Sequence, residues 1–309
     1  MAKRLADKVI TMDNTKQKNI FSRCILTLSP SWLGKKWLLY FGLLLTFNSL
    51  TVLAINAVDS PAIAVAANVK FAMDDIAKQF SQDTGLSVRL SYGSSGNFVS
   101  QILHGAPFEL LLSADELYPN KLVEAGVTQD AGHIYAMGRL ALAAPKNSPL
   151  KLDKQLLGLA SLIESGQLRR FAIANPVHAP YGESAKQVLI KKGLWQAIEP
   201  HIILGENASQ AAQFAVSGST QGGIVPLSLV LTPNFERIGQ YAAIADELYQ
   251  PINQRMVLMK TASSTAQQFY TYMLSSSAQQ ILLQYGFKVP EASSSQSSII
   301  SPSNTMEPD

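Results

Sequence analysis

From residue 61 onward, short apolar runs alternate with stretches in which apolar residues recur every three or four positions. Residues 63–67 are wholly apolar and predict a buried strand. In residues 69–80, apolar side chains at 69, 72, 73, 76, 77 and 80 have helical spacing. Asp74 and Asp75 fall in what we expect to be the early turns of this helix, where the helix dipole favours acidic residues. Residues 86–92 alternate apolar and polar positions, which predicts a second strand.

This succession of strands and helices continues to residue 285. Further strands are expected at 110–112, 140–144, 171–174, 202–204, 223–225 and 256–259. Further helices are expected at 97–104, 183–192, 210–216, 265–274 and 278–285. Because strands that alternate with helices of about 10–15 residues pair in parallel, the pattern predicts an α/β fold with mainly parallel sheets.

The first 57 residues have a different composition. Residues 37–57 contain no charged side chain and follow Lys35 and Lys36, which is typical of an export signal with a long basic region before it. We expect cleavage after Ala54 or Ala57. The alternative is an uncleaved membrane anchor, since about 20 apolar residues can span a bilayer. Both interpretations export the rest of the chain, whose Ser-rich residues 291–309 we interpret as a disordered tail.

The basic leader distorts the charge of the whole chain. Residues 1–57 carry eight of the 25 Lys and Arg and two of the 22 Asp and Glu, which leaves the remainder at about −3. The remainder has no basic stripe with interleaved aromatic residues, so we expect no nucleic-acid partner. The single cysteine, Cys24, lies in the leader. The exported part therefore has no disulfide, thiolate nucleophile or cysteine metal ligand.

Catalytic and metal-binding patterns are weak. No two histidines stand three or four positions apart, and neither a phosphate-binding loop nor a dinucleotide fingerprint is present. The segment 93–97, Gly-Ser-Ser-Gly-Asn, lacks the second Gly of a nucleophile elbow. A hydrolase that uses Ser95 and His178 is kept as an alternative, because His178 lies in a candidate binding loop.

Four junctions between an expected strand and an expected helix concentrate polar residues. A helix start has backbone N–H groups without partners and the positive end of the helix dipole, so it favours an anion. The junctions 66–69, 91–97, 179–182 and 205–210 contain no Lys or Arg. Their polar residues are Asn68, Ser94, Ser95, Asn97, Tyr181, Asn207 and Ser209. The pattern predicts an anion held by neutral donors, and the alternative is a set of ordinary helix caps.

Five motifs that occur in one order resemble those of the periplasmic molybdate-binding proteins of ABC transporters. The motifs are Ala66-Ala-Asn68, Ser91-Tyr-Gly-Ser-Ser-Gly96, Gly105-Ala-Pro-Phe-Glu-Leu-Leu-Leu-Ser-Ala-Asp115, Asn175-Pro-Val-His-Ala-Pro-Tyr-Gly182 and Gly205-Glu-Asn-Ala-Ser-Gln210. The resemblance covers about 62–290 and includes the closing Tyr285-Gly-Phe-Lys-Val-Pro290. It implies a two-lobed type II solute-binding fold with the ligand in the cleft between the lobes.

The resemblance also implies a domain organisation and a function. Lobe 1 would comprise 58–137 and 251–290, and lobe 2 would comprise 138–250. The protein would be a periplasmic monomer that captures molybdate or tungstate for the permease of an ABC transporter in the inner membrane, without enzymatic activity and without a cofactor. The alternatives are the same fold tuned to sulfate, phosphate or a small organic acid, and a membrane-tethered sensor with an uncleaved leader.

By motif, the anion-binding residues would be Ala67, Asn68, Ser95, Tyr181 and Ala208. Ala67 and Ala208 would donate backbone N–H groups, Ser95 its hydroxyl, Asn68 its amide, and Tyr181 would contribute through its turn. All would contact the oxygen atoms and none the metal directly.

The sequence departs from the family pattern at two positions. Ala67 occupies a position where some relatives have a hydroxyl, and Pro226, where another branch places a ligand-binding Tyr, has no N–H group. The carboxylates of Asp115 and Glu206 are expected to point away from the site or to pair locally.

Overall fold

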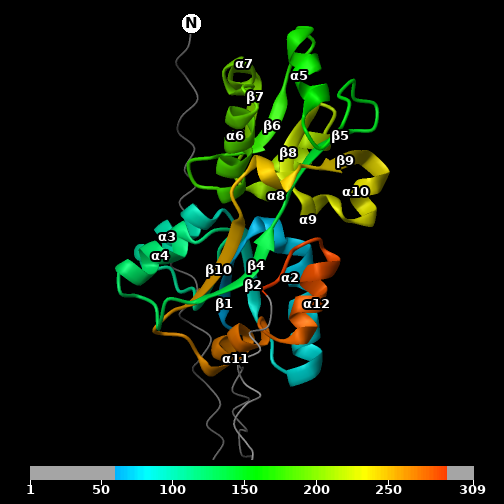
Figure 1. Cartoon of the computed structure of the whole chain (residues 1–309). Helices are drawn as coiled ribbons and strands as arrows, with labels where there is room; N and C mark the ends of the chain where they lie inside the picture. Colours follow the sequence, from blue (N-terminus) through cyan, green and yellow to red (C-terminus); the bar gives the residue numbers. More distant parts are fainter. Residues whose placement is uncertain (1–59, 291–309) are drawn as a thin grey trace, which may run out of the picture. The chain divides into compact units, whose positions relative to one another are not determined.

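The computed structural model describes residues 60–290 of the chain as two β-sheets flanked by helices (Figure 1). The first sheet has the strand order β2-β1-β3-β10-β4 and the second has the order β7-β6-β8-β5-β9. The strands of the first sheet are β1 (Ala62–Ala66), β2 (Arg89–Gly93), β3 (Leu110–Leu112), β4 (His133–Gly138) and β10 (Ile252–Leu258). Those of the second are β5 (Leu140–Pro145), β6 (Phe171–Ala174), β7 (Ile202–Gly205), β8 (Gly222–Pro226) and β9 (Gly239–Ala243).

Each sheet is mixed, although four of its five strands run in one direction. In the first sheet β1 pairs in parallel with β2 and β3, whereas β10 is antiparallel to both of its neighbours, β3 and β4. In the second sheet β6 pairs in parallel with β7 and β8, whereas β5 is antiparallel to β8 and β9. The expectation of mainly parallel sheets is thus confirmed, with one reversed strand in each.

The reversed strands are those that enter a sheet from the other one. The chain leaves the first sheet at the end of β4 and enters the second as β5, with Arg139 between them. It leaves the second sheet at the end of β9 and returns as β10. Gly138, the last residue of β4, is in register with Ile252, the first residue of β10. The two segments that connect the sheets therefore lie side by side (Figure 1). This arrangement gives two lobes joined by two adjacent segments.

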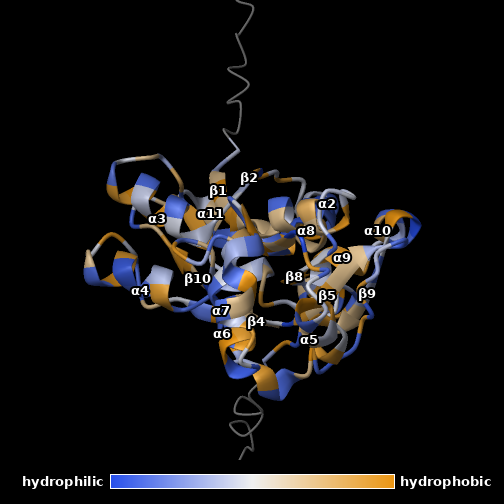
Figure 2. Ribbon diagram, turned by 90° about the horizontal axis from the view of Figure 1, so that it is seen from above, coloured by the Kyte–Doolittle hydropathy of each residue, from blue (hydrophilic) through white to orange (hydrophobic). Residues whose placement is uncertain are grey.

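The longer helices carry both hydrophilic and hydrophobic residues (Figure 2), and they bury their hydrophobic face against their lobe. With the first sheet lie η1 (Ala67–Val69), α2 (Lys70–Thr84), α3 (Ser95–Leu103), α4 (Leu117–Glu124), α11 (Ser264–Tyr272) and α12 (Ser276–Gln284). With the second lie α5 (Leu157–Glu164), α6 (Pro180–Lys191), α7 (Trp195–Ile198), η2 (Glu199–His201), α8 (Ala208–Val216), α9 (Leu227–Val230), α10 (Pro233–Ile238) and η3 (Asp246–Leu248).

The central strands are buried on both faces. Ile63 and Val65 of β1 belong to one hydrophobic cluster, and Ala64 between them belongs to another. Successive side chains of a strand point to opposite faces, so both faces of the first sheet are covered. This explains why β1 is apolar throughout rather than alternating. A third cluster, centred on β5, β6 and α8, fills the second lobe.

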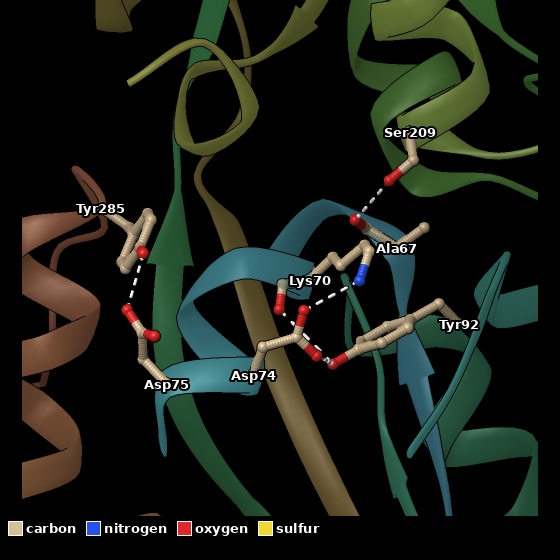
Figure 3. Close-up of polar contacts among 7 residues, drawn as sticks. All are labelled: Ala67, Lys70, Asp74, Asp75, Tyr92, Ser209 and Tyr285. Carbon is tan, nitrogen blue, oxygen red and sulfur yellow. Dashed lines mark hydrogen bonds and ion pairs between the residues drawn. The ribbon is translucent and has the colours of Figure 1, made fainter. Parts of the chain in front are cut away.

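Asp74 and Asp75 do not lie in the first turn of α2, which contains no acidic residue. The helix begins at Lys70, after the separate turn η1, so both carboxylates lie in its second turn, which agrees with their expected place in the early turns. Asp74 instead pairs with the Lys70 ammonium at 2.8 Å and accepts the hydroxyl of Tyr92 (Figure 3). Asp75 accepts the hydroxyl of Tyr285 at 2.7 Å, which ties α2 to the end of α12 (Figure 3).

Two sequence predictions lie outside the described residues. These are the leader with its export signal, within 1–57, and the Ser-rich tail 291–309. In the part that the structure does describe, none of the helices combines the length and the apolar character needed to traverse a bilayer.

Candidate functional site

A small cavity lies where strands of both sheets end and helices begin. Its volume, as the space open to the centre of a water molecule, is about 10 Å³. All five residues expected to bind an anion line it. The full lining consists of Ala66, Ala67, Asn68, Gly93, Ser94, Ser95, Ala114, Ala179, Pro180, Tyr181 and Ala208. The structure therefore brings together, from four separate junctions, the residues that the sequence singles out.

Each junction supplies one wall of the cavity. β1 leads into η1, β2 into α3, β6 into α6 and β7 into α8. In α/β sheets, ligands bind in the crevice outside the carboxyl ends of the strands. Four helical segments here begin at the same cavity, so their first N–H groups and the positive ends of their dipoles gather around it. That arrangement stabilises negative charge.

Ser95 is fully buried at the start of α3. Its Oγ accepts the backbone N–H of Ala114 at 3.0 Å. Ala114 follows β3 and also lines the cavity. Because a hydroxyl has one proton to donate as well as lone pairs to accept, this bond holds the oxygen in place and leaves the O–H free for a ligand.

Ala208 and Tyr181 are placed to act through the backbone. Ala208 is the first residue of α8, and Asn207 caps that helix with its side chain, which accepts the N–H of Gln210 at 3.1 Å. Tyr181 is the second residue of α6, after Pro180. N–H groups in the first turn of a helix have no acceptor within the helix. Both N–H groups are therefore free to donate to an anion in the cavity.

Gly182 explains part of the Pro-Tyr-Gly motif. A Cβ atom at this position would lie 2.2 Å from the carbonyl oxygen of Ala174, the last residue of β6. Real Cβ atoms do not come so close to backbone, so any larger residue would push α6 away from the strand. Gly182 thus allows the start of α6, and with it the N–H of Tyr181, to lie against the end of β6.

Asn68 is buried in η1, and its side chain meets a residue that the sequence analysis missed. Asn68 Nδ2 donates to Oε1 of Gln254 at 2.9 Å, and Asn68 Oδ1 is buried without a hydrogen-bond partner. Gln254 is fully buried on the crossover strand β10. Its Nε2 donates to the hydroxyl of Tyr181 at 3.2 Å, and its Oε1 accepts the hydroxyl of Tyr135 at 3.0 Å. Gln254 lies between Asn253 and Arg255 in β10, so its residue type does not distinguish it from its half-buried polar neighbours.

The cavity is electrically neutral in its own side chains. Among residues 60–290, those that line it include no Lys, Arg, His, Asp or Glu. Burial raises the pKa of the Tyr181 and Tyr135 phenols well above their usual value, so both remain protonated at neutral pH. Any anion held here is held by uncharged dipoles.

The two nearby carboxylates pair locally, as expected. Asp115 accepts the Ser113 hydroxyl at 2.8 Å and the backbone N–H of Tyr118 at 3.3 Å. Burial raises the pKa of the Asp115 carboxyl, and these two hydrogen bonds oppose that rise. Glu206 accepts the Asn97 side-chain amide at 2.5 Å, and its other oxygen lies 3.7 Å from Nε2 of His178. Neither carboxylate lines the cavity.

The Ser95–His178 pair that the hydrolase alternative requires is not formed. Nδ1 of His178 lies 3.1 Å from Oγ of Ser94, the neighbouring residue just before α3, whereas Ser95 Oγ bonds to Ala114. Within the described residues, moreover, no cluster of three or more His, Cys, Asp or Glu is arranged to hold a metal ion. The geometry offers donors for an anion rather than metal ligands.

Other polar residues of the junctions connect the two lobes. Ser209 of α8 donates its hydroxyl to the carbonyl of Ala67 at 2.9 Å (Figure 3), and Ser228 of α9 donates to the carbonyl of Asn68 at 2.7 Å. On another side of the cavity, the N–H of Gly96 donates to the carbonyl of His178 at 3.0 Å. These bonds join the lobes around the cavity, so the structure shows the closed arrangement.

Two lobes with a cavity at the carboxyl ends of their strands define the class of solute-binding proteins. The model of the family described as bacterial extracellular solute-binding protein matches residues 62–288. The chain belongs to this family.

Two relatives and one solved structure that are similar to this chain are molybdate-binding proteins. The chain is 37% identical over 228 residues to the molybdate-binding protein ModA of Azotobacter vinelandii, covering 73% of this chain and 88% of that one. It is 34% identical to ModA of Rhodobacter capsulatus over 72% of this chain and 86% of that one. The solved structure of the A. vinelandii periplasmic molybdate-binding protein superposes with a TM-score of 0.68 at 29% identity, covering 75% of this chain and all of that one. The resemblance to molybdate-binding proteins is confirmed.

A more distant neighbour shares only the fold. The sulfate-binding protein SubI of Mycobacterium tuberculosis superposes with a TM-score of 0.61 at 17% identity, over 75% of this chain and 87% of that one. A protein named for binding a different oxyanion thus has the same two-lobed fold. The fold alone does not identify the ligand, which has to be argued from the cavity.

Proposed function

We propose that this protein captures molybdate or tungstate outside the cytoplasmic membrane and delivers the anion to the permease of an ABC transporter. The observation that carries the proposal is the neutral cavity formed by helix starts of both lobes. The names of the relatives agree with it, since ModA of A. vinelandii and ModA of R. capsulatus are both molybdate-binding proteins.

In this proposal Ala67, Asn68, Ser95, Tyr181 and Ala208 bind the oxygens of the anion. Ser95 donates its hydroxyl, Asn68 its side-chain amide, and the other three their backbone N–H groups. Hydrogen bonds to a charged group contribute about 1.5–3 kcal/mol each after the exchange with water, so five of them together favour binding of a dianion. A cage without a Lys or Arg forms no ion pair with its ligand, which favours release to a permease.

Capture follows from closure of the lobes. Ser95 and Asn68 come from the first lobe and Tyr181 and Ala208 from the second. An open form would present each half of the donors separately, and only the closed form surrounds a tetrahedral anion. The anion therefore binds the closed form more tightly, and this difference in affinity drives closure.

Size and protonation select the anion. Molybdate and tungstate have longer metal–oxygen bonds than the sulfur–oxygen bonds of sulfate, so a cavity fitted to them holds sulfate loosely. Hydrogenphosphate carries a proton, and a cage made only of donors cannot accept it. Sulfate, phosphate and small organic acids are the competing ligands.

The remaining assignments belong to the same proposal. Residues 1–57 form a basic leader whose apolar part directs export, lobe 1 comprises 58–137 and 251–290, lobe 2 comprises 138–250, and 291–309 form a tail. The protein acts as a monomer, without a cofactor and without catalysis. N-terminal sequencing of exported protein tests the leader: a start near residue 55 or 58 supports cleavage, and an intact leader indicates an anchor.

Isothermal titration calorimetry of the purified protein with molybdate, tungstate, sulfate and phosphate tests the function. We expect one molybdate or tungstate per chain and much weaker binding of sulfate and phosphate. Sulfate or phosphate binding as tightly as molybdate would indicate a general oxyanion binder, and no binding of any of the four would exclude oxyanion capture.

A further inference from the structure

Four buried polar side chains form a cluster behind the cavity. Gln254 of β10 is at its centre and contacts Asn68 of η1, Tyr135 of β4 and Tyr181 of α6. The four side chains come from both lobes and from a crossover strand, and each of their residues is at most 2% exposed. Buried polar groups need their hydrogen-bond partners, so the number of donors and acceptors in this cluster constrains how its amides are turned.

With Gln254 Oε1 facing Asn68 and Tyr135, the cluster is short of partners. The Tyr135 hydroxyl has one proton but lies 3.0 Å from Gln254 Oε1 and 3.1 Å from the carbonyl of Ser113, both of which only accept. One of these acceptors is therefore left without the proton. Asn68 Oδ1 is also buried without a partner. An unsatisfied buried acceptor costs about 1–3 kcal/mol.

Turning both side-chain amides by 180° gives a partner to every group of the cluster except the Asn68 nitrogen. The oxygen and nitrogen of an amide occupy nearly equivalent positions, so the turn leaves the heavy atoms where they are. Tyr135 then donates to Ser113. The Gln254 nitrogen donates one proton to Tyr135 and the other to Asn68 Oδ1, and the Gln254 oxygen accepts the proton of Tyr181. The Asn68 nitrogen moves to the position that has no protein partner.

We infer that Gln254 is a positioning residue, which turns the Asn68 amide so that its nitrogen, not its oxygen, faces the anion. The inference deepens the proposed function and rests on it for the identity of the anion. Gln254 is itself oriented by Tyr135 and Ser113, so the direction of the Asn68 amide is set by a chain of hydrogen bonds within the first lobe and its crossover strand. An oxygen in that place would repel a dianion.

The same arrangement assigns the phenol of Tyr181. Its proton is donated to Gln254, so the residue serves the ligand through its backbone N–H, and its hydroxyl fastens the second lobe to β10. Gly138, the last residue of β4, leaves room for this hydroxyl, since a Cβ there would lie 2.0 Å from it. Gln254 thus couples the position of α6 to the direction of the Asn68 amide.

Nuclear magnetic resonance of the ¹⁵N-labelled full chain tests the orientation in the wild-type protein. With the Gln254 side-chain amide resonances assigned by their loss in Gln254→Met, we expect nuclear Overhauser effects from them to the ring of Tyr135. Effects to the ring of Tyr181 alone would overturn the inference. The spectra are recorded with and without molybdate. A chain that gives the Tyr135 pattern but binds no molybdate would refute the proposed function and leave the amide orientation intact.

Binding by two variants tests the consequence. Gln254→Met removes both partners at similar volume and should weaken molybdate binding about tenfold, because the Asn68 amide is no longer held. At a pH where its carboxyl is ionised, Gln254→Glu offers acceptors only, so Asn68 must turn its nitrogen toward Glu and its oxygen toward the anion. We expect its affinity for molybdate to fall by about a further tenfold. Glu also adds charge, which affects all dianions alike, so hydrogenphosphate, which can donate to the Asn68 oxygen, should lose less affinity than molybdate. Equal losses for the two anions would contradict the inference.

Discussion

At the scale of single residues, Ser95 offers the clearest test of a side-chain donor. Its hydroxyl is buried in the cavity wall and is held by the N–H of Ala114. Ser95→Ala removes the donor, and because a hydrogen bond to a charged group contributes about 1.5–3 kcal/mol, molybdate affinity should fall about tenfold or more. Calorimetric titration measures the change. Ser100→Ala, on an exposed position of the same helix, is the control and should bind as the wild type does. An unchanged affinity of Ser95→Ala would exclude its hydroxyl from the site.

The ionisation of the cavity residues gives a second prediction at this scale. The pKa values of the Tyr181 and Tyr135 phenols lie well above the usual value because both are buried. A phenol with a raised pKa stays neutral to higher pH, so no phenolate forms to repel the anion. Molybdate affinity should therefore be constant between about pH 7.5 and 9.5, a range in which an ordinary histidine is already neutral. Titrations across this range check it, and an affinity that falls steadily with pH would show that a cavity residue ionises.

At the scale of elements, the start of α8 tests whether a backbone N–H binds the anion. Proline is well tolerated at the first position of a helix, and Asn207 before it has the extended conformation that proline requires of its neighbour. Ala208→Pro thus removes the N–H with little damage to α8 and should weaken molybdate binding about tenfold or more. Ala208→Val keeps the N–H and serves as the control for side-chain size. Equal affinities of the two variants would show that this N–H is not a donor.

The elements also show what can be predicted from sequence. The apolar runs of β1, β6 and β7 and the helix starts after them are local features, so the four junctions were predictable with their residues. The sequence analysis did not predict β4, β9, α4, α5, α7, α9 or α10. The single reversed strand in each sheet was not predictable either, because it depends on pairing between distant segments. Gln254 was missed for the same reason: its partner Asn68 lies 186 positions away, and no local pattern connects them.

At the scale of the whole molecule, ligand binding should stabilise the closed arrangement of the lobes. A ligand at 100 times its dissociation constant adds about 2.7 kcal/mol to the free energy of unfolding, which for a chain of this size raises the melting temperature by roughly 5–10 °C. Thermal unfolding with molybdate should show such a rise, while sulfate at the same concentration should show little. Equal rises with the two anions would mean that the cavity does not discriminate by size.

The most direct test of the account is the position of molybdenum in crystals grown with molybdate. Anomalous difference density recorded near the molybdenum absorption edge locates the metal without reference to the protein. We predict one strong peak per chain, in the cavity between Asn68 and Ser95 of the first lobe and Tyr181 and Ala208 of the second. A peak outside this cavity, or a lysine or arginine side chain reaching the peak, would contradict the claim that uncharged dipoles from both lobes hold one tetrahedral dianion.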